Sequence, residues 1–177
     1  MKIVTDSAVD MPLEELKQYD ITQAPLLIQF PEGEVNATEI SADEFYNRLE
    51  AMRPALPTTA APSGGIFADL YKLLSHRDRQ ILSIHISSGL SGTFNAARMA
   101  STMVEGADVT LVDTLNLSAG SGWQVEAAAK AARQGWSKER ILDMVHKIRH
   151  ATHTIYTLPD LKYLIAGGRI SHLKGLL

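Results

Sequence analysis

The sequence contains no cysteine, which excludes disulfide bonds, thiolate catalysis and cysteine-based zinc sites. It has no apolar run long enough to cross a bilayer, and Asp6 stands where a signal peptide would place its apolar stretch. It also lacks an excess of basic residues, since the formal net charge of the 177-residue chain is -3. These absences predict a soluble, cytoplasmic protein that does not bind nucleic acid.

Nucleotide-binding motifs are missing as well. A P-loop needs Gly-Lys-Ser/Thr, and a dinucleotide-binding turn needs Gly-x-Gly-x-x-Gly, and neither pattern occurs. The composition is otherwise that of a globular protein, with 45% hydrophobic and 21% charged residues. These values indicate a folded domain, whose loops are the expected place for a site.

Strand and helix patterns alternate from Met1 to about His150, which is typical of a parallel sheet with helices on both faces. Buried strands are expected at residues 2–5, 80–86 and 109–112. Helices are expected at residues 13–19, 45–52, 65–75, 93–103, 121–134, 137–149 and 158–165. Asp10, Ser41 and Ser63 are the expected N-caps of the first three of these helices, in that order.

Three further stretches have their own signals. Residues 21–30 are apolar and extended, and Pro25 favours a sheet edge or two short strands. Residues 53–65 are dense in Pro, Thr and Gly and are expected to form a loop, whereas residues 152–157 are rich in β-formers.

In a parallel sheet, ligands bind beyond the carboxyl ends of strands, where this chain places polar clusters at Asp6, Ser87–Thr93 and Asp113.

The segment Ser87–Thr93 reads SSGLSGT and carries four hydroxyls and two glycines before an alanine-rich helix. Free N–H groups at a helix start, together with the helix dipole, favour an anion, either a carboxylate or a phosphoryl group. A serine-hydrolase elbow would need Gly-x-Ser-x-Gly, but Thr93 replaces the last glycine. An ordinary capped helix would need only one serine, so four hydroxyls favour an anion seat.

Histidines offer a weaker signal. His146, His150 and His153 have the spacing of one helical face, but no carboxylate supports a metal there, so we interpret them as solvated or capping side chains. His85 falls within a buried strand and is interpreted as a core histidine with satisfied hydrogen bonds. Arg169, after a glycine pair, could bind an anion bidentately or lie on the surface beyond a helix end.

Several stretches in this order closely resemble the DegV family of bacterial proteins, and the resemblance covers essentially the whole chain. The matching stretches are VTDSAVDMP, PTTAAPS, ISSGLSGTFNAA, LVDTLNLSAGSG and LKYLIAGGRIS. The resemblance implies a two-domain α/β protein without catalytic activity or cofactor that binds one long-chain fatty acid, such as palmitate. It further implies that this protein presents the acyl carboxylate to a separate fatty-acid kinase subunit, with no more than transient membrane contact.

The same resemblance implies the site residues. Thr59 and Ser91 are expected to hold the carboxylate, with Arg169 near the head group or the kinase contact. Gly92, Thr93 and Ser88 complete the expected ligand-binding set, although Ser88 and Thr93 are expected mainly to shape the turn. Five apolar residues could line a tunnel for the acyl chain, but the same residues could equally belong to the hydrophobic core. They are Phe67, Leu70, Phe94, Ala97 and Ile28.

Two departures from the family pattern stand out. The family loop usually reads Thr-Ser-Gln-Pro, whereas this chain has Thr59-Ala60-Ala61-Pro62, so two polar side chains beside the head group are missing. Family members are also about a hundred residues longer, as two-domain chains would be, and the family histidine of the ligand region lies in that extra part. We expect an α/β domain at residues 1–151 and the truncated beginning of a second at residues 152–177.

Overall fold

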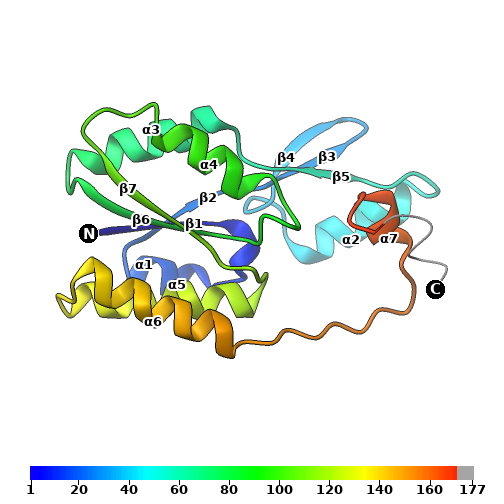
Figure 1. Cartoon of the computed structure of the whole chain (residues 1–177). Coiled ribbons are helices and arrows are strands. Elements are labelled where there is room, and N and C mark those ends of the chain that lie inside the picture. Colours follow the sequence, from blue (N-terminus) through cyan, green and yellow to red (C-terminus); the bar gives the residue numbers. More distant parts are fainter. Residues whose placement is uncertain (171–177) are drawn as a thin grey trace. The chain divides into compact units, whose positions relative to one another are not determined.

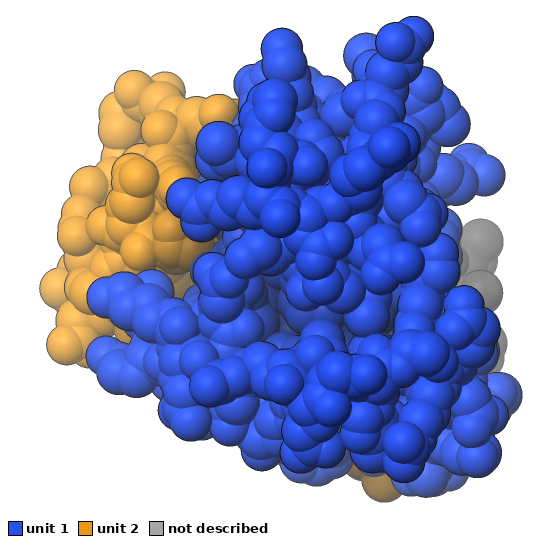
Figure 2. All heavy atoms as spheres, turned by 90° about the vertical axis from the view of Figure 1, so that its left-hand side faces the viewer, with its two compact units in different colours: residues 1–25, 61–154 blue, residues 26–60, 155–177 orange. Residues whose placement is uncertain are grey.

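The computed structural model describes residues 1–170, and the chain forms two compact units, which are coloured separately in Figure 2. Unit 1 comprises Met1–Pro25 and Ala61–Thr154, and unit 2 comprises Leu26–Ala60 and the residues from Ile155 onward. The expected boundary near residue 152 lies close to the end of unit 1, but Leu26–Ala60 groups with the later segment. The two contiguous domains therefore stay a prediction.

Unit 1 is built on a parallel sheet with the strand order β2-β1-β6-β7 (Figure 1). Its strands are β1 (Lys2–Asp6), β2 (Ile21–Ala24), β6 (Gln80–His85) and β7 (Asp108–Asp113). The α/β fold class with a parallel sheet, predicted from the alternating pattern, is confirmed. Parallel strands put their carboxyl ends at one edge of the sheet, which is where the polar clusters had been expected.

Helices cover both faces of this sheet (Figure 1). On one face lie α3 (Gly64–Ser75) and α4 (Thr93–Ser101). The other face is covered by α1 (Leu13–Gln18), α5 (Ala119–Arg133) and α6 (Lys138–Ala151). The two-sided packing explains why successive residues of β1 and β6, which point to opposite faces, are almost all buried.

Alternation along the strands divides the core between these faces. Val4 and Ile81 are buried on the α3 and α4 side, whereas Ile3 and Leu82 are buried on the α5 and α6 side. Burial of each such side chain contributes about 2 kcal/mol. By the same alternation, polar residues at even positions of β1 and odd positions of β6 face α3.

Unit 2 contains a small antiparallel sheet with the order β4-β3-β5. Its strands are β3 (Leu27–Phe30), β4 (Gly33–Asn36) and β5 (Thr58–Ala60), and its helices are α2 (Ala42–Ala51) and α7 (Lys162–Ala166). The chain therefore forms two short strands, β2 and β3, on either side of Pro25, as predicted. The strand β5 lies inside the stretch expected to be a loop, so that prediction was wrong for these three residues.

Two of the three predicted helix caps are confirmed. The Ser41 hydroxyl accepts a hydrogen bond from the Glu44 N–H over 3.2 Å, and the Ser63 hydroxyl accepts one from the Ile66 N–H over 3.3 Å. The third predicted cap, Asp10, does not cap α1. That residue adopts a left-handed conformation (φ 50°), and Pro12 occupies the N-cap position of α1 without a side-chain hydrogen bond. The prediction of Asp10 as a cap was wrong because a 3-10 helix, η1 (Ser7–Val9), occupies the preceding residues.

Residues 152–157 do not form a strand, contrary to the expectation from their composition. β-Formers need a partner strand, and the described part of the chain pairs none with them. Within residues 1–170, none of the helices is both long and apolar enough to cross a membrane.

Candidate functional site

The hydroxyl-rich turn joins β6 to α4 at the carboxyl edge of the parallel sheet. Hydrogen bonds from three directions fix its backbone. Ser87 N–H donates to the Asn116 carbonyl over 2.9 Å, and Ser88 N–H donates to both carboxylate oxygens of Asp113 over 3.2 and 3.3 Å. The N–H of Ser91 in turn donates to the Ser87 carbonyl over 3.1 Å. The turn is therefore held by the last residue of β7, by Asn116 beyond it and by a bond of its own.

Within this turn, Ser91 and Thr93 form a hydroxyl pair. Their Oγ and Oγ1 atoms lie 2.8 Å apart, and the Thr93 N–H donates to Ser91 Oγ over 3.3 Å. Thr93 is fully buried, whereas Ser91 is half-buried. When the Thr93 hydroxyl donates to Ser91, the Ser91 proton remains available for an outside acceptor. In that one of the two possible directions of the bond, Ser91 can donate to an outside acceptor while Thr93 orients it.

The other predicted residues of the turn are exposed. Gly92, rather than Ser91, is the N-cap residue of α4, and it has room for a larger side chain, since a Cβ there would meet nothing within 4 Å. Ser88 lies beside the carboxylate of Asp113, which already accepts its N–H. A second anion next to Asp113 would be repelled, so an incoming carboxylate is favoured at Ser91 and the first turn of α4 rather than at Ser88.

A buried polar chain lies directly behind the turn, on the α3 side of the sheet. His85 Nδ1 lies 3.0 Å from Asp6 Oδ2, and His85 Nε2 lies 2.7 Å from Ser83 Oγ. Ser83 Oγ lies 2.8 Å from the Tyr71 hydroxyl. All four side chains are completely buried, and burial raises the pKa of Tyr71 to about 12 although the hydrogen bond to Ser83 opposes that shift. The interpretation of His85 as a satisfied core histidine is confirmed.

The order Ser83, His85, Asp6 has the hydrogen-bonding pattern of a catalytic triad. A nucleophile must reach its substrate, but Ser83 has no exposed surface and its hydroxyl also bonds Tyr71. The arrangement therefore does not suit acyl transfer. The sequence patterns did not predict this series of hydrogen-bonded side chains, although Asp6 was noted as a polar residue at the end of a strand.

Two predicted residues, Thr59 and Arg169, belong to unit 2, whereas the turn belongs to unit 1. Thr59 lies on β5 opposite Ile28 of β3 and is exposed. Arg169 is exposed, its backbone N–H donates to the Leu164 carbonyl over 2.8 Å, and its Nη1 donates to the Gly167 carbonyl over 2.6 Å. Each remains a candidate ligand residue within its own unit.

Most of the proposed acyl tunnel in unit 1 is core. Phe67 and Ala97 are completely buried, and Leu70 packs against the same cluster. Phe67 also stacks on Tyr71 and contacts the His85 ring edge-on, with centroids 6.0 and 5.0 Å apart. Phe67, Leu70 and Ala97 therefore belong to the core on the α3 and α4 side of the sheet.

An open hollow of about 380 Å³ lies at the opposite end of the sheet, where it is lined by the beginning of β1, by residues 18–20 and by α5. Its charged groups are already paired: Lys2 with Asp20 over 2.5 Å, and Arg133 with the Gln18 carbonyl over 2.8 Å. It therefore adds no unpaired charge that an anion could use. Among the described residues, no group of His, Asp and Glu is arranged to hold a metal ion, and His146, His150 and His153 are exposed.

Comparison with known sequences identifies a family match along the whole chain. The family model of the uncharacterised DegV proteins matches residues 1–177. A DegV domain-containing protein of Streptococcus pneumoniae is 37% identical over 177 residues, which are 100% of this chain and 63% of that protein. A DegV domain-containing protein of Lactococcus lactis is 34% identical over 176 residues, or 99% of this chain and 63% of the relative. The chain thus spans about 63% of the length of these relatives.

Solved structures give the same result. A DegV-family protein of Thermus thermophilus, described by its fatty-acid binding, superposes with a TM-score of 0.89 at 31% identity, covering 99% of this chain and 62% of that one. DegV of Bacillus subtilis, described as a fatty-acid-binding protein, has a TM-score of 0.87 at 31% identity, covering 96% and 61%. A stearic-acid-binding protein of Eubacterium ventriosum has a TM-score of 0.85 at 26% identity, covering 97% and 61%.

Proposed function

The chain belongs to the DegV family, and from this premise we propose that it binds a long-chain fatty acid whose carboxylate accepts a hydrogen bond from Ser91 at the start of α4. The observation that carries the proposal is the pair formed by half-buried Ser91 and fully buried Thr93, whose hydroxyls lie 2.8 Å apart. Solved relatives described as fatty-acid-binding proteins support the choice of ligand.

The energetics of such a ligand fit a site with few polar groups. Each buried methylene contributes about 0.8 kcal/mol, so a long acyl chain supplies most of the binding free energy. An unpaired carboxylate would offset much of that gain, because a buried charge without hydrogen bonds is costly. Ser91 and the N–H groups of the first turn of α4 would supply the missing donors, and the helix dipole favours the negative charge.

The remaining predicted residues take secondary roles in this proposal. Gly92 lets the ligand approach the backbone, Thr93 orients Ser91, and Ser88 shapes the turn. Thr59 and Arg169, both in unit 2, are proposed as further ligand residues by the family resemblance, and each is testable by its own substitution. Also by that resemblance, the protein is a non-catalytic subunit that presents the carboxylate to a separate kinase for conversion into an acyl phosphate.

Native mass spectrometry tests the binding proposal. The delipidated chain is mixed with palmitate, and a complex of one acyl chain per protein is expected. The Ser91→Ala variant should bind palmitate at least about tenfold more weakly, because a hydrogen bond to a charged group is lost. Ser101→Ala is the matched control, since that hydroxyl lies at the other end of the same helix and donates to the Arg98 carbonyl. Absence of any complex, or equal affinities for all three proteins, would refute the proposal.

The kinase proposal needs a separate measurement. With a fatty-acid kinase catalytic subunit, ATP and the palmitate complex, an acyl phosphate is expected, and Arg169→Ala should lower its rate of formation. If palmitate binds but no acyl phosphate forms with any such subunit, the chain binds lipid without serving a kinase.

A further inference from the structure

We propose that Asp6 and His85 are positioning residues that hold the turn bearing Ser91 in its binding geometry. The role of the turn as a carboxylate seat rests on the proposed function, but the mechanical link rests on contacts within unit 1 alone. Neither residue is placed in contact with the ligand, since both side chains are completely buried.

The carboxylate of Asp6 binds two backbone N–H groups and one side chain. Its Oδ1 accepts the Ala8 N–H over 3.0 Å, and its Oδ2 accepts the Ile86 N–H over 3.0 Å as well as the bond from His85. Ile86 is the residue at which the chain leaves β6 for the turn. A carboxylate on β1 therefore fixes the starting direction of a loop about eighty residues away in the sequence.

His85 fixes that carboxylate in turn. Because a carboxylate only accepts, His85 Nδ1 must carry the proton, and Nε2 of a neutral ring then accepts from Ser83. Ser83 accepts from Tyr71, so the hydroxyl protons of Tyr71 and Ser83 both have an acceptor. A charged ring would reverse both hydroxyl bonds and turn the buried Tyr71 proton away from Ser83, which favours the neutral ring and a single direction of hydrogen bonding.

The link from Asp6 to Ser91 is short. The residue after Ile86 is Ser87, whose carbonyl accepts the N–H groups of Leu90 and Ser91 over 2.9 and 3.1 Å. Asp113 fixes the other side of the same turn through the Ser88 N–H. A shift of Ile86 therefore moves the acceptor that holds Ser91.

The cost of this arrangement argues for a role beyond core stability. Neighbouring positions on the same face, Val4 and Ile81, are apolar, and a buried charged group is a less favourable way to fill a core than an apolar side chain. The carboxylate and imidazole occur only where the strands meet the turn. Local backbone positioning explains that placement.

The test uses two substitutions of one residue and a control. His85→Leu removes the donor to Asp6, whereas His85→Asn retains a donor at the place of Nδ1. Ser83→Ala perturbs the same buried chain without touching Asp6. The affinities for palmitate and for 1-hexadecanol, which has the alkyl chain but no carboxylate, are measured for each variant by native mass spectrometry.

The proposal predicts that His85→Leu weakens palmitate binding at least about tenfold but hexadecanol binding less than about twofold. His85→Asn should restore most of the affinity, and Ser83→Ala should change either affinity less than about threefold. Equal losses for both ligands, or equal losses in His85→Leu and Ser83→Ala, would overturn the proposal, because a merely structural role predicts them.

Amide hydrogen exchange of the ligand-free chain separates this inference from the proposed function. In His85→Leu the Ile86 and Ser91 amides should exchange at least about tenfold faster, relative to amides of α6, than in the wild type. Unchanged exchange would overturn the positioning role whatever the ligand. Faster exchange in a chain that binds no palmitate would uphold the mechanical link and refute only the fatty-acid seat.

Discussion

The hydroxyl of Thr93 lies 2.8 Å from that of Ser91 and has no access to solvent, whereas Ser91 is half-buried. A buried hydroxyl needs a partner, and Ser91 provides it. The consequence is that Thr93 limits the orientations of the Ser91 hydroxyl before any ligand arrives. With the Thr93 hydroxyl as the donor, the Ser91 hydroxyl keeps its own proton for an outside acceptor, which is the geometry that the proposed function requires.

Thr93→Val tests that relationship with little change in volume. Valine keeps the shape of threonine but leaves Ser91 without its hydroxyl partner, so palmitate affinity should fall about three- to tenfold. Thr93→Ser keeps the hydroxyl and should bind more tightly than Thr93→Val. Isothermal titration with palmitate measures both, and a valine variant that binds as tightly as the wild type would rule out the orienting role.

A fluorophosphonate probe distinguishes ligand binding from serine hydrolysis. Ser83 has the partners of a triad serine but is completely buried, and Ser91 accepts the Thr93 N–H without a described histidine partner. We expect no covalent adduct at either serine by intact-mass analysis, with a known serine hydrolase as the positive control. An adduct at Ser91 that disappears in Ser91→Ala would establish the hydrolase alternative instead.

Tyr71 predicts a pH dependence of stability. Burial raises its pKa from 10.0 to about 12, so between these values the unfolded chain loses the proton while the folded chain retains it. The stabilisation is complete below pH 10 and is lost as the pH rises, by about 2 kcal/mol at pH 12. Urea unfolding between pH 9 and 12 should therefore show that the free energy of unfolding of the wild type falls relative to that of Tyr71→Phe. A difference that stays constant with pH would contradict the shift.

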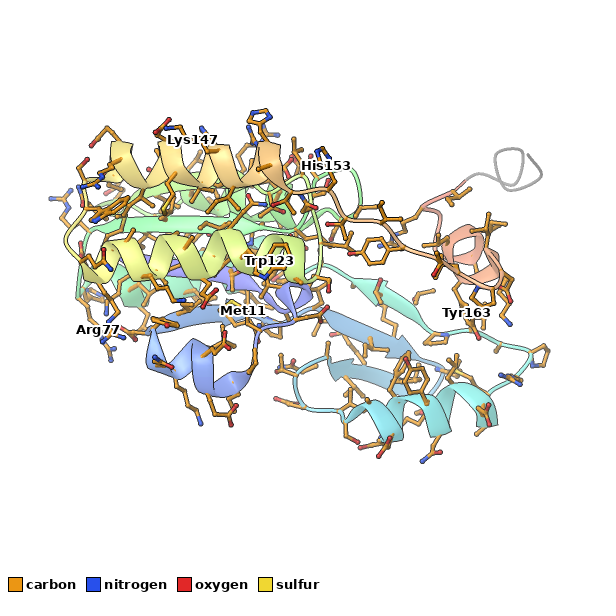
Figure 3. All side chains as sticks on the ribbon, turned by 90° about the horizontal axis from the view of Figure 1, so that it is seen from below. Met11, Arg77, Trp123, Lys147, His153 and Tyr163 are labelled. Carbon is orange, nitrogen blue, oxygen red and sulfur yellow. The ribbon has the colours of Figure 1, made fainter. Side chains whose placement is uncertain are left out.

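Close packing at the start of α5 predicts a position at which a side chain is destabilising. A Cβ on Gly122 would lie 2.8 Å from the Val9 carbonyl oxygen and 3.4 Å from Met11 Cγ, and Met11 lies beside α5 near Trp123 in Figure 3. Gly122→Ala should destabilise the chain by about 1–3 kcal/mol in urea unfolding.

Gly65→Ala is the matched control for that substitution, since a Cβ there would lie 3.6 Å from Ser63 Oγ, an ordinary contact. It should be neutral or stabilise by up to about 1 kcal/mol, because alanine favours a helix. Equal effects of the two substitutions would show that close packing does not decide the outcome.

Sequence patterns predicted the larger part of unit 1 because its elements are long and strongly periodic. Apolar strands such as β6, and the serine caps of α2 and α3, are local signals that act through neighbouring residues. Pro25 likewise marked the break between β2 and β3. In each case the determining interaction lies within a few residues of the sequence.

Predictions failed where distant pairing decides the structure. Thr58 and Thr59 form a strand only because β3, about thirty residues away, supplies the partner and Gln29 bonds Thr58 over 3.0 Å. Residues 152–157 have the composition of a strand but no partner within the described residues. Segments this short do not show a hydrophobic periodicity from which pairing with a distant strand could be predicted.

The location of the proposed carboxylate site was predictable in part. The glycines and hydroxyls of the turn indicated the location, and the family resemblance selected Ser91. The contributions of Asp6 and Asp113 were visible only as polar residues at strand ends, because their bonds to Ile86 and Ser88 depend on which strands become neighbours. Sheet order, not local sequence, brings these groups to the turn.

A crystal structure of the chain with palmitate would test the central claim most directly. The account predicts a carboxylate oxygen within about 3 Å of Ser91 Oγ, at the first turn of α4, with the Ser91–Thr93 pair intact. Electron density for the acyl chain with its carboxylate elsewhere, or a compact anion at Ser91 while palmitate is excluded, would contradict it.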